Sequence, residues 1–295
     1  MNRHRTTARG IAFLTLVFGL FSAGAAAAPQ KAVPRLLFPV VGGATYIDDF
    51  GQPRAGGTHQ GNDLMAERHT PAVAVEAGKV KFWTTSASAG CMLYLYGDSG
   101  TTYLYIHLNN DLTANNDNRG KCVAGTSYAP GMKDGMHVAA GQLVGYVGDS
   151  GDANGIHPHL HFEVHPNDGA AVDPYKYLRK AQLLLFYAKR GATVALTLNG
   201  TVVSSADGSL QLKLERLQVS GSKQAVTCSQ KLSLVVAPDA IVQMTADLPG
   251  FGGVVPLAAI KPGYKVTVYT EPAAVTLAAQ RGDPDVLSAA RIILG

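Results

Sequence analysis

Apolar and polar side chains alternate along short stretches of the chain between about residues 35 and 177. Branched and aromatic residues recur there at every second position, which is typical of β-strands. Glycine-rich segments such as 97–100 and 148–155 separate these stretches as turns do. The predicted strands cover residues 72–75, 80–84, 92–96, 101–107, 143–147 and 159–165. Residues 109–136 lack this periodicity and are predicted to form a long loop.

The periodicity changes after this mainly β region. Residues 174–191 carry apolar side chains at helical intervals and end at glycine, which predicts a short helix leading into a linker at residues 181–191. Alternation then returns at residues 193–198, 210–217, 232–236 and 264–269, with turns predicted at Asn199-Gly200 and Asp207-Gly208. The pattern predicts a second, small all-β domain, either a barrel or a sandwich.

The first 28 residues have the three parts of a secretory signal peptide. Arginines 3, 5 and 9 precede an apolar run over residues 11–21, and a tract of small residues follows to Ala28. The apolar run is shorter than the roughly 20 residues that a membrane-spanning helix needs. No later stretch is long and apolar enough to span a bilayer. We therefore expect an exported protein of the periplasm, the cell wall or the extracellular space.

Composition sets the domain layout and excludes one class of partner. The 295 residues suffice for one large or two ordinary domains, predicted as 1–28 signal peptide, 29–180 first domain, 181–191 linker and 192–295 second domain. The net charge is +4. Removing the three arginines of the signal leaves 22 basic and 21 acidic residues, a net charge of +1. Such a balance does not support nucleic-acid binding.

Three cysteines, Cys91, Cys122 and Cys228, remain in the chain. Export permits disulfides, but three cysteines cannot all pair within one chain. A bridge between Cys91 and Cys122 would close a loop and stabilise the fold by about 3–4 kcal/mol in the chain-entropy model. The alternative is three buried free thiols, and sequence alone does not fix the pairing.

Histidine and aspartate residues occur at spacings that suit a metal site. His59 and Asp63 are four residues apart in THQGNDL, which contains glycine and is expected to turn. His159 and His161 are two apart on a predicted strand, so both side chains project from one face. His107 in YLYIHL is a fifth candidate. Imidazole and carboxylate groups are ligands that zinc takes.

Five candidates exceed the three protein ligands of a catalytic zinc, and this surplus suits hydrolysis. Zinc lowers the pKa of bound water toward about 7 and polarises a carbonyl, while nearby imidazoles move protons. A single His-x-x-x-Asp or His-x-His arises readily by chance, so the combination carries the argument. Spacing alone does not say which three of the five residues bind metal.

The same residues resemble the motifs of the lysostaphin/LytM family of zinc metallopeptidases, which cut peptidoglycan peptides. The family's His-x-Gly-x-Asp corresponds to residues 59–63, its Tyr-x-His-Leu to 105–108, and its Pro-His-Leu-His-Phe-Glu to 158–163. The similarity runs from about residue 38 to 177, half of the chain, with the three motifs in family order. The tight first spacing resembles the lysostaphin type more than related zinc peptidases that cleave D-alanyl peptides.

The resemblance implies a fold and a division of roles. It implies an antiparallel β-sheet with an open groove for an extended peptide. It also implies that His59, Asp63 and His161 bind Zn²⁺, whereas His107 and His159 form an unligated catalytic pair. Within that pair, one imidazole is the general base and the other stabilises the tetrahedral intermediate.

Four further residues near these motifs have no implied role. Glu163 shares the strand face of His159 and His161, and either orients a ligand by hydrogen bonding or is a satisfied polar residue of the sheet surface. The others, His69, His157 and His165, are expected at the surface or beside the site.

The sequence thus predicts a secreted zinc metalloendopeptidase that hydrolyses peptide bonds in the stems or cross-bridges of bacterial peptidoglycan. The alternative is a non-catalytic protein of the same fold that binds the wall or activates other wall hydrolases. All five motif residues are present, which favours the enzyme. The domain from residue 192 onward carries no catalytic motif, and contact with wall polymer or another protein is a hypothesis for its role. The sequence does not identify the peptide bond that is cut.

Overall fold

The computed structural model of the protein describes residues 32–84, 86–206, 208–222, 225–244 and 254–295. The signal peptide predicted over residues 1–28 lies outside this part of the chain. Within it, no helix has the length and apolar character needed to cross a membrane.

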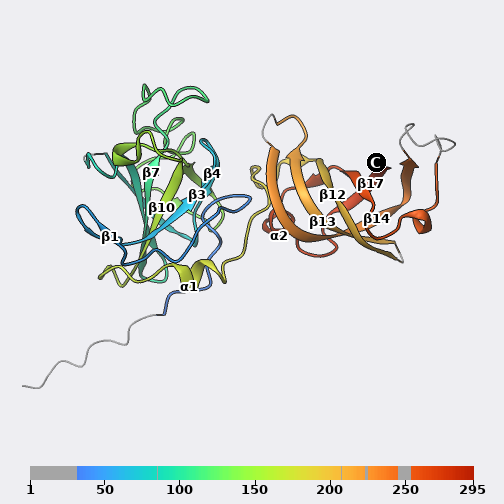
Figure 1. Cartoon of the computed structure of the whole chain (residues 1–295), viewed down its shortest axis with the longest axis horizontal. Helices are drawn as coiled ribbons and strands as arrows, with labels where there is room; N and C mark the ends of the chain where they lie inside the picture. The colour runs from blue at the N-terminus through green and yellow to red at the C-terminus, as the bar shows by residue number, and fades with distance from the viewer. Residues whose placement is uncertain (1–31, 85, 207, 223–224, 245–253) are drawn as a thin grey trace, which may run out of the picture. The chain divides into compact units, whose positions relative to one another are not determined.

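An antiparallel six-stranded sheet forms the centre of the first domain (Figure 1). Its strands, in spatial order, are β3 (Asn62–Met65), β10 (His159–Pro166), β7 (Thr101–Leu108), β6 (Cys91–Gly97), β5 (Gly78–Trp83) and β8 (His137–Val138). Two short antiparallel pairs accompany it: β1 (Pro53–Arg54) with β2 (Gly57–Thr58), and β4 (Pro71–Val73) with β9 (Leu143–Tyr146). All six strands predicted for this domain are confirmed within a few residues.

Strand β10 shows how the sheet separates its two faces. Leu160, Phe162 and Val164 are completely buried in the apolar core. The alternate residues, among them His161 and Glu163, project from the opposite face, as the period of two requires. The predicted placement of both strand histidines on one face is therefore confirmed, and burial of the alternate residues fixes the register.

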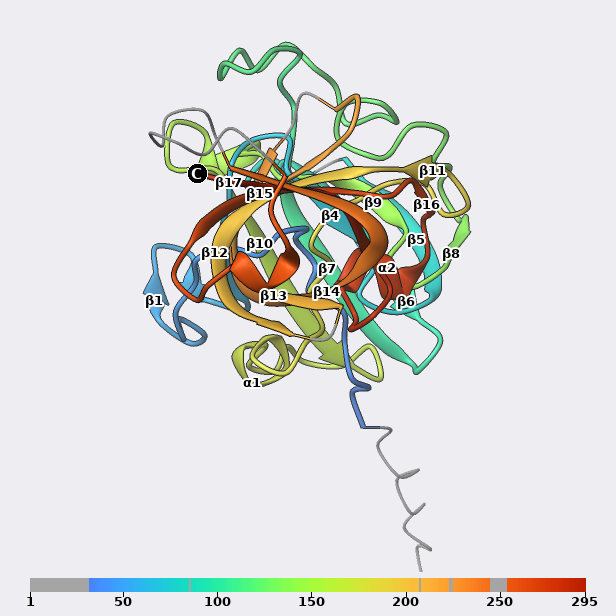
Figure 2. The same cartoon turned by 90° about the vertical axis from the view of Figure 1, so that its right-hand side faces the viewer.

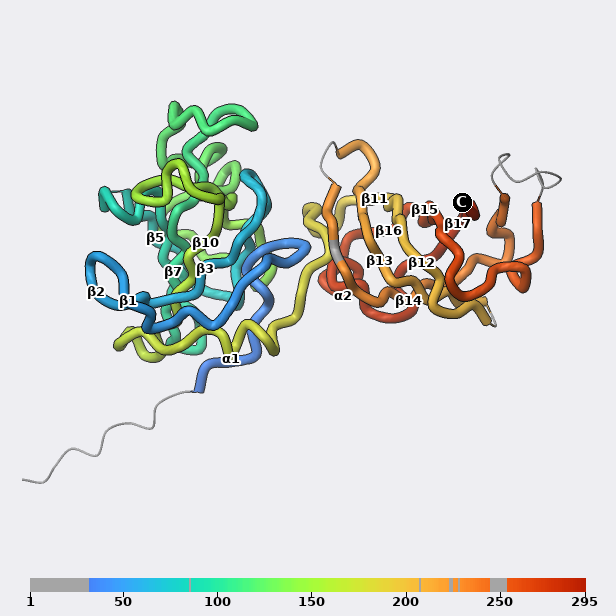
Figure 3. Tube along the Cα trace, viewed as in Figure 1, coloured from blue at the N-terminus to red at the C-terminus, as the bar shows by residue number. Residues whose placement is uncertain are grey.

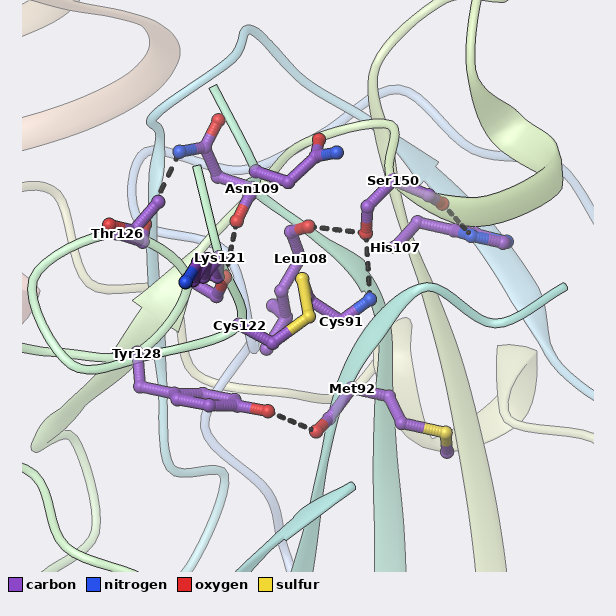
Figure 4. Close-up of a disulfide and its surroundings, with 12 residues drawn as sticks. Cys91, Met92, His107, Leu108, Asn109, Lys121, Cys122, Thr126, Tyr128 and Ser150 are labelled. Carbon is purple, nitrogen blue, oxygen red and sulfur yellow. Dashed lines mark hydrogen bonds between the residues drawn. A yellow bond between two sulfur atoms is a disulfide. The ribbon is translucent and has the colours of Figure 1, made fainter. Parts of the chain in front are cut away.

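The long loop between β7 and β8 is fastened to the sheet by a disulfide (Figure 4). Cys91 on β6 is bonded to Cys122 in the loop, with 5.1 Å between their Cα atoms, so of the two alternatives left open by the sequence the structure contains the bridge. The Cys91 backbone N–H donates to Ser150 Oγ at 2.9 Å, and Ser150 Oγ donates to the carbonyl of Leu108 at 2.6 Å. The disulfide and Ser150 thus join the loop, β6 and the end of β7.

Replacing Cys91 and Cys122 together by alanine is expected to lower the free energy of unfolding by about 3–4 kcal/mol, because a bridge over 31 residues restricts the unfolded chain. Urea unfolding of the variant measures the change. Wild-type protein unfolded in the presence of a reductant provides the matched control and is expected to lose the same amount. An unchanged midpoint in both samples would contradict the prediction.

The short helix predicted at the start of residues 174–191 is present but covers a single turn. Helix α1 covers only Tyr175–Leu178, and the chain leaves the helical path after Arg179. The apolar residues that follow serve two cores: Leu184 packs with Leu37, Val41 and Val73 of the first domain, whereas Leu185 and Phe186 belong to the core of the second. Because Leu184 and Leu185 pack into different cores, this segment has no single apolar face of the kind that a helix buries. The spacing of apolar residues was therefore misleading.

The second domain is a closed five-stranded barrel, which settles the choice between barrel and sandwich (Figure 2). Its strands, in order around the barrel, are β12 (Leu196–Ala206), β13 (Ser209–Val219), β14 (Ala225–Met244), β17 (Ser288–Leu294) and β15 (Lys265–Thr270). Strand β15 returns beside β12, as in a Greek key, and β17 lies parallel to β14. The shorter elements are β11 (Thr193–Val194), β16 (Ala273–Ala274), the 3₁₀ turn η2 (Leu257–Ala259) and helix α2 (Leu277–Arg281).

One of the two turns predicted in this domain is wrong. Asn199 and Gly200 lie inside β12, where the register with β13 shifts at a bulge. A Cβ atom on Gly200 would lie 2.5 Å from the carbonyl oxygen of Lys213, so glycine permits a close approach of strands here rather than a turn. The second turn joins β12 to β13 and includes Gly208, whereas Asp207 lies outside the described residues.

Candidate active site

Three of the five predicted residues converge on one point at the edge of the six-stranded sheet. His59 follows β2, Asp63 lies on β3, and His161 pairs with Asp63 across the strands β3 and β10. His59 Nε2 lies 2.9 Å from His161 Nδ1, and both nitrogens lie close to Asp63 Oδ1, at 3.1 and 3.0 Å. Atoms bound to one tetrahedral zinc at about 2.0–2.1 Å lie about 3.3 Å apart. The donor set therefore fits a zinc ion.

The glycine of the first motif, Gly61, lies where two backbone segments approach each other closely. A Cβ atom at this position would lie 2.5 Å from the carbonyl oxygen of Phe162 and 2.8 Å from the His161 ring. Any larger residue would push β10 away from the loop that carries His59. The close approach of these two backbones brings the two imidazoles together.

The outer nitrogen of His59 is held by Asp49. Nδ1 of His59 lies 2.9 Å from the backbone carbonyl of Asp49 and 3.2 Å from its carboxylate. A carbonyl only accepts, so Nδ1 carries the proton and Nε2 directs a lone pair toward Asp63 and His161. Asn62 in turn donates to the Asp49 carboxylate at 2.6 Å. This arrangement is the carboxylate support that metal-binding histidines commonly have.

His161 is held in the same way by Glu163. Its Nε2 donates to Glu163 Oε1 at 3.0 Å, which leaves the lone pair of Nδ1 facing His59 and Asp63. His165 contacts the other oxygen of Glu163 at 2.6 Å. Of the two roles considered for Glu163, the geometry supports the orientation of His161.

The site stabilises positive charge. Burial lowers the pKa of His161, but hydrogen bonds to Asp63 and Glu163 outweigh burial and raise it to about 9. Burial raises the pKa of Asp63, but hydrogen bonds to His161 and His59 outweigh that effect and hold the pKa well below its usual range. Two imidazole lone pairs and a carboxylate directed at one point suit a cation, and a divalent metal competes there with protons.

His107 reaches this site through a bulge in β7. Cys91 pairs with Leu108 but Leu93 pairs with Tyr105, so β7 has one residue more than β6 between these pairs. His107 has a φ of 62°, which is rare for residues other than glycine. Without the bulge, strict alternation would place His107 on the core face with Tyr105. The bulge turns its side chain toward His159, and the ring centroids lie 5.0 Å apart.

The two imidazoles outside the triad both direct Nε2 toward it, because Nδ1 of each is bonded to a backbone carbonyl. His107 Nδ1 donates to the carbonyl of Ser150 at 2.8 Å, and His159 Nδ1 donates to the carbonyl of His157 at 3.0 Å. His159 Nε2 lies 3.7 Å from Asp63 Oδ1. Burial and then repulsion from His159 lower the pKa of His107 to about 4. His107 is thus neutral near pH 7 and able to accept a proton at Nε2.

Two charged residues of the same cleft, Arg54 and Asp152, were not found from the sequence. Arg54 Nη2 donates to Asp63 Oδ2 at 2.9 Å, and Asp152 Oδ1 lies 3.8 Å from His107 Nε2. Neither belongs to a spaced motif. The signal available in the sequence was their position, because Arg54 lies five residues before His59 and Asp152 lies within the glycine-rich segment 148–155.

Three further histidines near the motifs lie outside the cluster. His69 contacts the carbonyl of Thr113, and His157 contacts that of Pro158, both at 2.8 Å. His165 touches the site only through Glu163. These positions agree with the expectation of surface or supporting residues.

Residues 123–174 match the protein family described as Peptidase family M23. This part of the chain is a peptidase M23 domain. The matched segment contains the last motif, with His159, His161 and Glu163, whereas the residues around His59 and His107 precede it. The resemblance to the lysostaphin/LytM peptidase family, stated from the motifs, is confirmed.

Two curated relatives align with a longer stretch of the chain than the family model does. The chain is 27% identical over 146 residues to the L-Ala--D-Glu endopeptidase of Bacillus subtilis (strain 168), an alignment that covers 46% of this chain and 40% of that protein. It is 29% identical over 149 residues to lysostaphin of Staphylococcus staphylolyticus, covering 49% of this chain and 26% of that protein. The chain thus spans less than half the length of either relative.

Among solved structures, the catalytic domain of lysostaphin from Staphylococcus simulans is 27% identical to the chain. The alignment covers 46% of this chain and 92% of that domain, with a TM-score of 0.36.

Proposed function

We propose that the protein is an exported zinc endopeptidase that cuts peptide bonds of bacterial peptidoglycan. The observation that carries the proposal is the convergence of His59, Asp63 and His161 on one point, within an M23 peptidase domain. The names of the relatives, an L-Ala--D-Glu endopeptidase and lysostaphin, support a peptide substrate. The Cys91–Cys122 disulfide supports export, because such bonds persist in oxidising compartments.

The three converging residues would hold the metal. A zinc ion bound by them supplies Lewis acidity, which polarises the scissile carbonyl and lowers the pKa of a water molecule. Asp49 and Glu163 keep the two histidine ligands in the tautomer that presents a lone pair.

His107 and His159 would carry out the proton transfers. Each presents Nε2 to the cleft while its Nδ1 is fixed by a backbone carbonyl. One ring takes a proton from the attacking water as general base. The other, once protonated, donates a hydrogen bond to the oxygen on which negative charge develops.

The decisive experiment combines metal analysis with wall digestion. The purified protein is expected to contain about one zinc per chain by elemental mass spectrometry, and to release peptides from purified peptidoglycan. Removal of zinc with a chelator should stop the release, and added zinc should restore it. His161→Ala should lose the metal and the activity together, because it removes one of three ligands.

Mass analysis of the released fragments identifies the scissile bond. Zinc-loaded protein that releases nothing from any wall preparation would contradict the proposal and favour the alternative, a non-catalytic regulator of wall hydrolases. The predicted contact of the second domain with wall polymer or another protein stays a prediction, because no observation on its described residues bears on it.

A further inference from the structure

Two oppositely charged side chains flank the candidate metal site without being part of it. Arg54 and Asp152 both line the cleft that contains His59, His107 and His161. Their side chains are 48% and 69% exposed, respectively. Both are thus accessible to a molecule that enters the cleft, and the inference below rests on the proposed peptidase function.

Arg54 has hydrogen-bonding capacity left over. It lies at the end of β1, in the hairpin seen at the left of the first domain in Figure 3. Only its Nη2 contacts other described residues, with Asp63 at 2.9 Å, His59 at 3.2 Å and Asp49 at 3.5 Å. Its Nε and Nη1 donate to no atom in the described part of the chain. Nε and Nη1 can therefore each donate a single hydrogen bond to a second carboxylate while Nη2 stays on Asp63.

Asp152 is similarly available on the other side. It lies in the 3₁₀ turn η1 (Gly151–Ala153), and its carboxylate contacts only His107 among the described side chains, at 3.8 Å. That distance is longer than a hydrogen bond. The carboxylate therefore keeps its acceptor sites for a cationic group in the cleft.

The sheet order places these two charges on opposite sides of the candidate metal site. Arg54 contacts Asp63 on β3, whereas Asp152 lies beside His107 on β7, and β10 with His161 runs between those strands. Two strand spacings are about 10 Å. An extended peptide covers that distance with about three residues. Side chains close to the scissile bond therefore come within reach of both charges.

We propose that the cleft selects peptides with a free carboxylate on one side of the scissile bond and a free amine on the other. The carboxylate pairs with Arg54, and the amine pairs with Asp152. A peptide composed only of glycine would leave both charges unpaired and is expected to be a poorer substrate. Arg54 and Asp152 thereby act as specificity determinants rather than as part of the chemistry.

Four synthetic peptides test the proposal. They share the scissile bond found by mass analysis and differ in two positions, with glutamate or glutamine on one side and lysine or acetyl-lysine on the other. Wild-type kcat/KM is expected to favour glutamate over glutamine, and lysine over acetyl-lysine, by about tenfold each, as for hydrogen-bonded charge pairs. Binding of the same peptides to the His107→Asn variant, followed by fluorescence anisotropy, should show the same preferences without turnover.

Two variants test the contributions of the two charges separately. Arg54→Gln is expected to reduce the preference for glutamate to about onefold while the preference for lysine persists, and Asp152→Asn should do the reverse. Arg54→Lys should keep part of the preference for glutamate. Arg119→Gln, which removes an exposed arginine that pairs with Asp117 in the long loop, is the matched control and should change neither ratio.

The outcomes distinguish this proposal from the proposed function. Equal cleavage of all four peptides by the wild type would overturn the charge selection and leave the peptidase intact. A uniform loss for all four peptides in Arg54→Gln, together with weaker zinc binding, would mean that Arg54 only positions Asp63. If zinc-loaded wild type cleaves neither the peptides nor the wall, the proposed function itself fails.

Discussion

Replacing His107 by asparagine is expected to leave zinc bound and to reduce peptide hydrolysis by about 10²–10⁴-fold, the range that general acid–base groups supply. His107 Nδ1 donates to the Ser150 carbonyl, and among the described residues no backbone atom bonds to its Nε2. Its ring is neutral near pH 7 because burial and the neighbouring His159 lower its pKa to about 4. Asparagine tolerates the positive φ at this position better than alanine does, so the backbone is preserved while the imidazole is lost.

The measurement pairs kcat on a cleaved peptide with zinc content and with the midpoint of thermal unfolding. His159→Ala is expected to behave like His107→Asn, because its ring faces the same cleft. The control is His137→Asn, which removes an exposed imidazole that pairs with Asp98 on another part of the sheet. A His107→Asn variant with a normal rate and normal zinc would show that this residue has no part in proton transfer.

Part of this site could be predicted from the sequence because it follows local rules. On β10 the period of two places His159, His161 and Glu163 on one face, and the buried Leu160 and Phe162 fix which face that is. The bridge between Cys91 and Cys122 was one of two alternatives that the sequence left open, and the structure contains it. The strand face follows from residue spacing, and three cysteines allow few pairings.

Other features depend on contacts between segments that are distant in sequence. The bulge that turns His107 out of the core depends on the register between β6 and β7, which no pattern within β7 reveals. Asp49, Arg54 and Asp152 matter because of the atoms they contact, and each occurs outside a recognisable motif. The shortness of helix α1 has the same cause, since the apolar residues that follow it are divided between two separate cores.

Replacing Arg68 by methionine is expected to lower the free energy of unfolding by about 3–5 kcal/mol, a range typical of a buried ion pair that loses one partner. Arg68 Nε lies 3.1 Å from Asp111 Oδ2, and its Nη2 bonds to Asp149 Oδ2. The side chains of both aspartates are fully buried, whereas Arg68 is 20% exposed. Methionine fills much of the same volume but leaves two carboxylates in the interior without a cation.

Urea unfolding measures the loss of stability in Arg68→Met, and two further variants show how much of it comes from the buried charges. Lys81→Met breaks an exposed pair with Asp134 and should cost at most about 1 kcal/mol. Adding Asp111→Asn and Asp149→Asn to Arg68→Met should recover part of the loss, because amides carry no charge to bury. A loss of less than about 1 kcal/mol in Arg68→Met would contradict the assignment. Asp149 adjoins Ser150, whose carbonyl fixes His107. Arg68→Met should therefore also lower kcat while its zinc content stays normal.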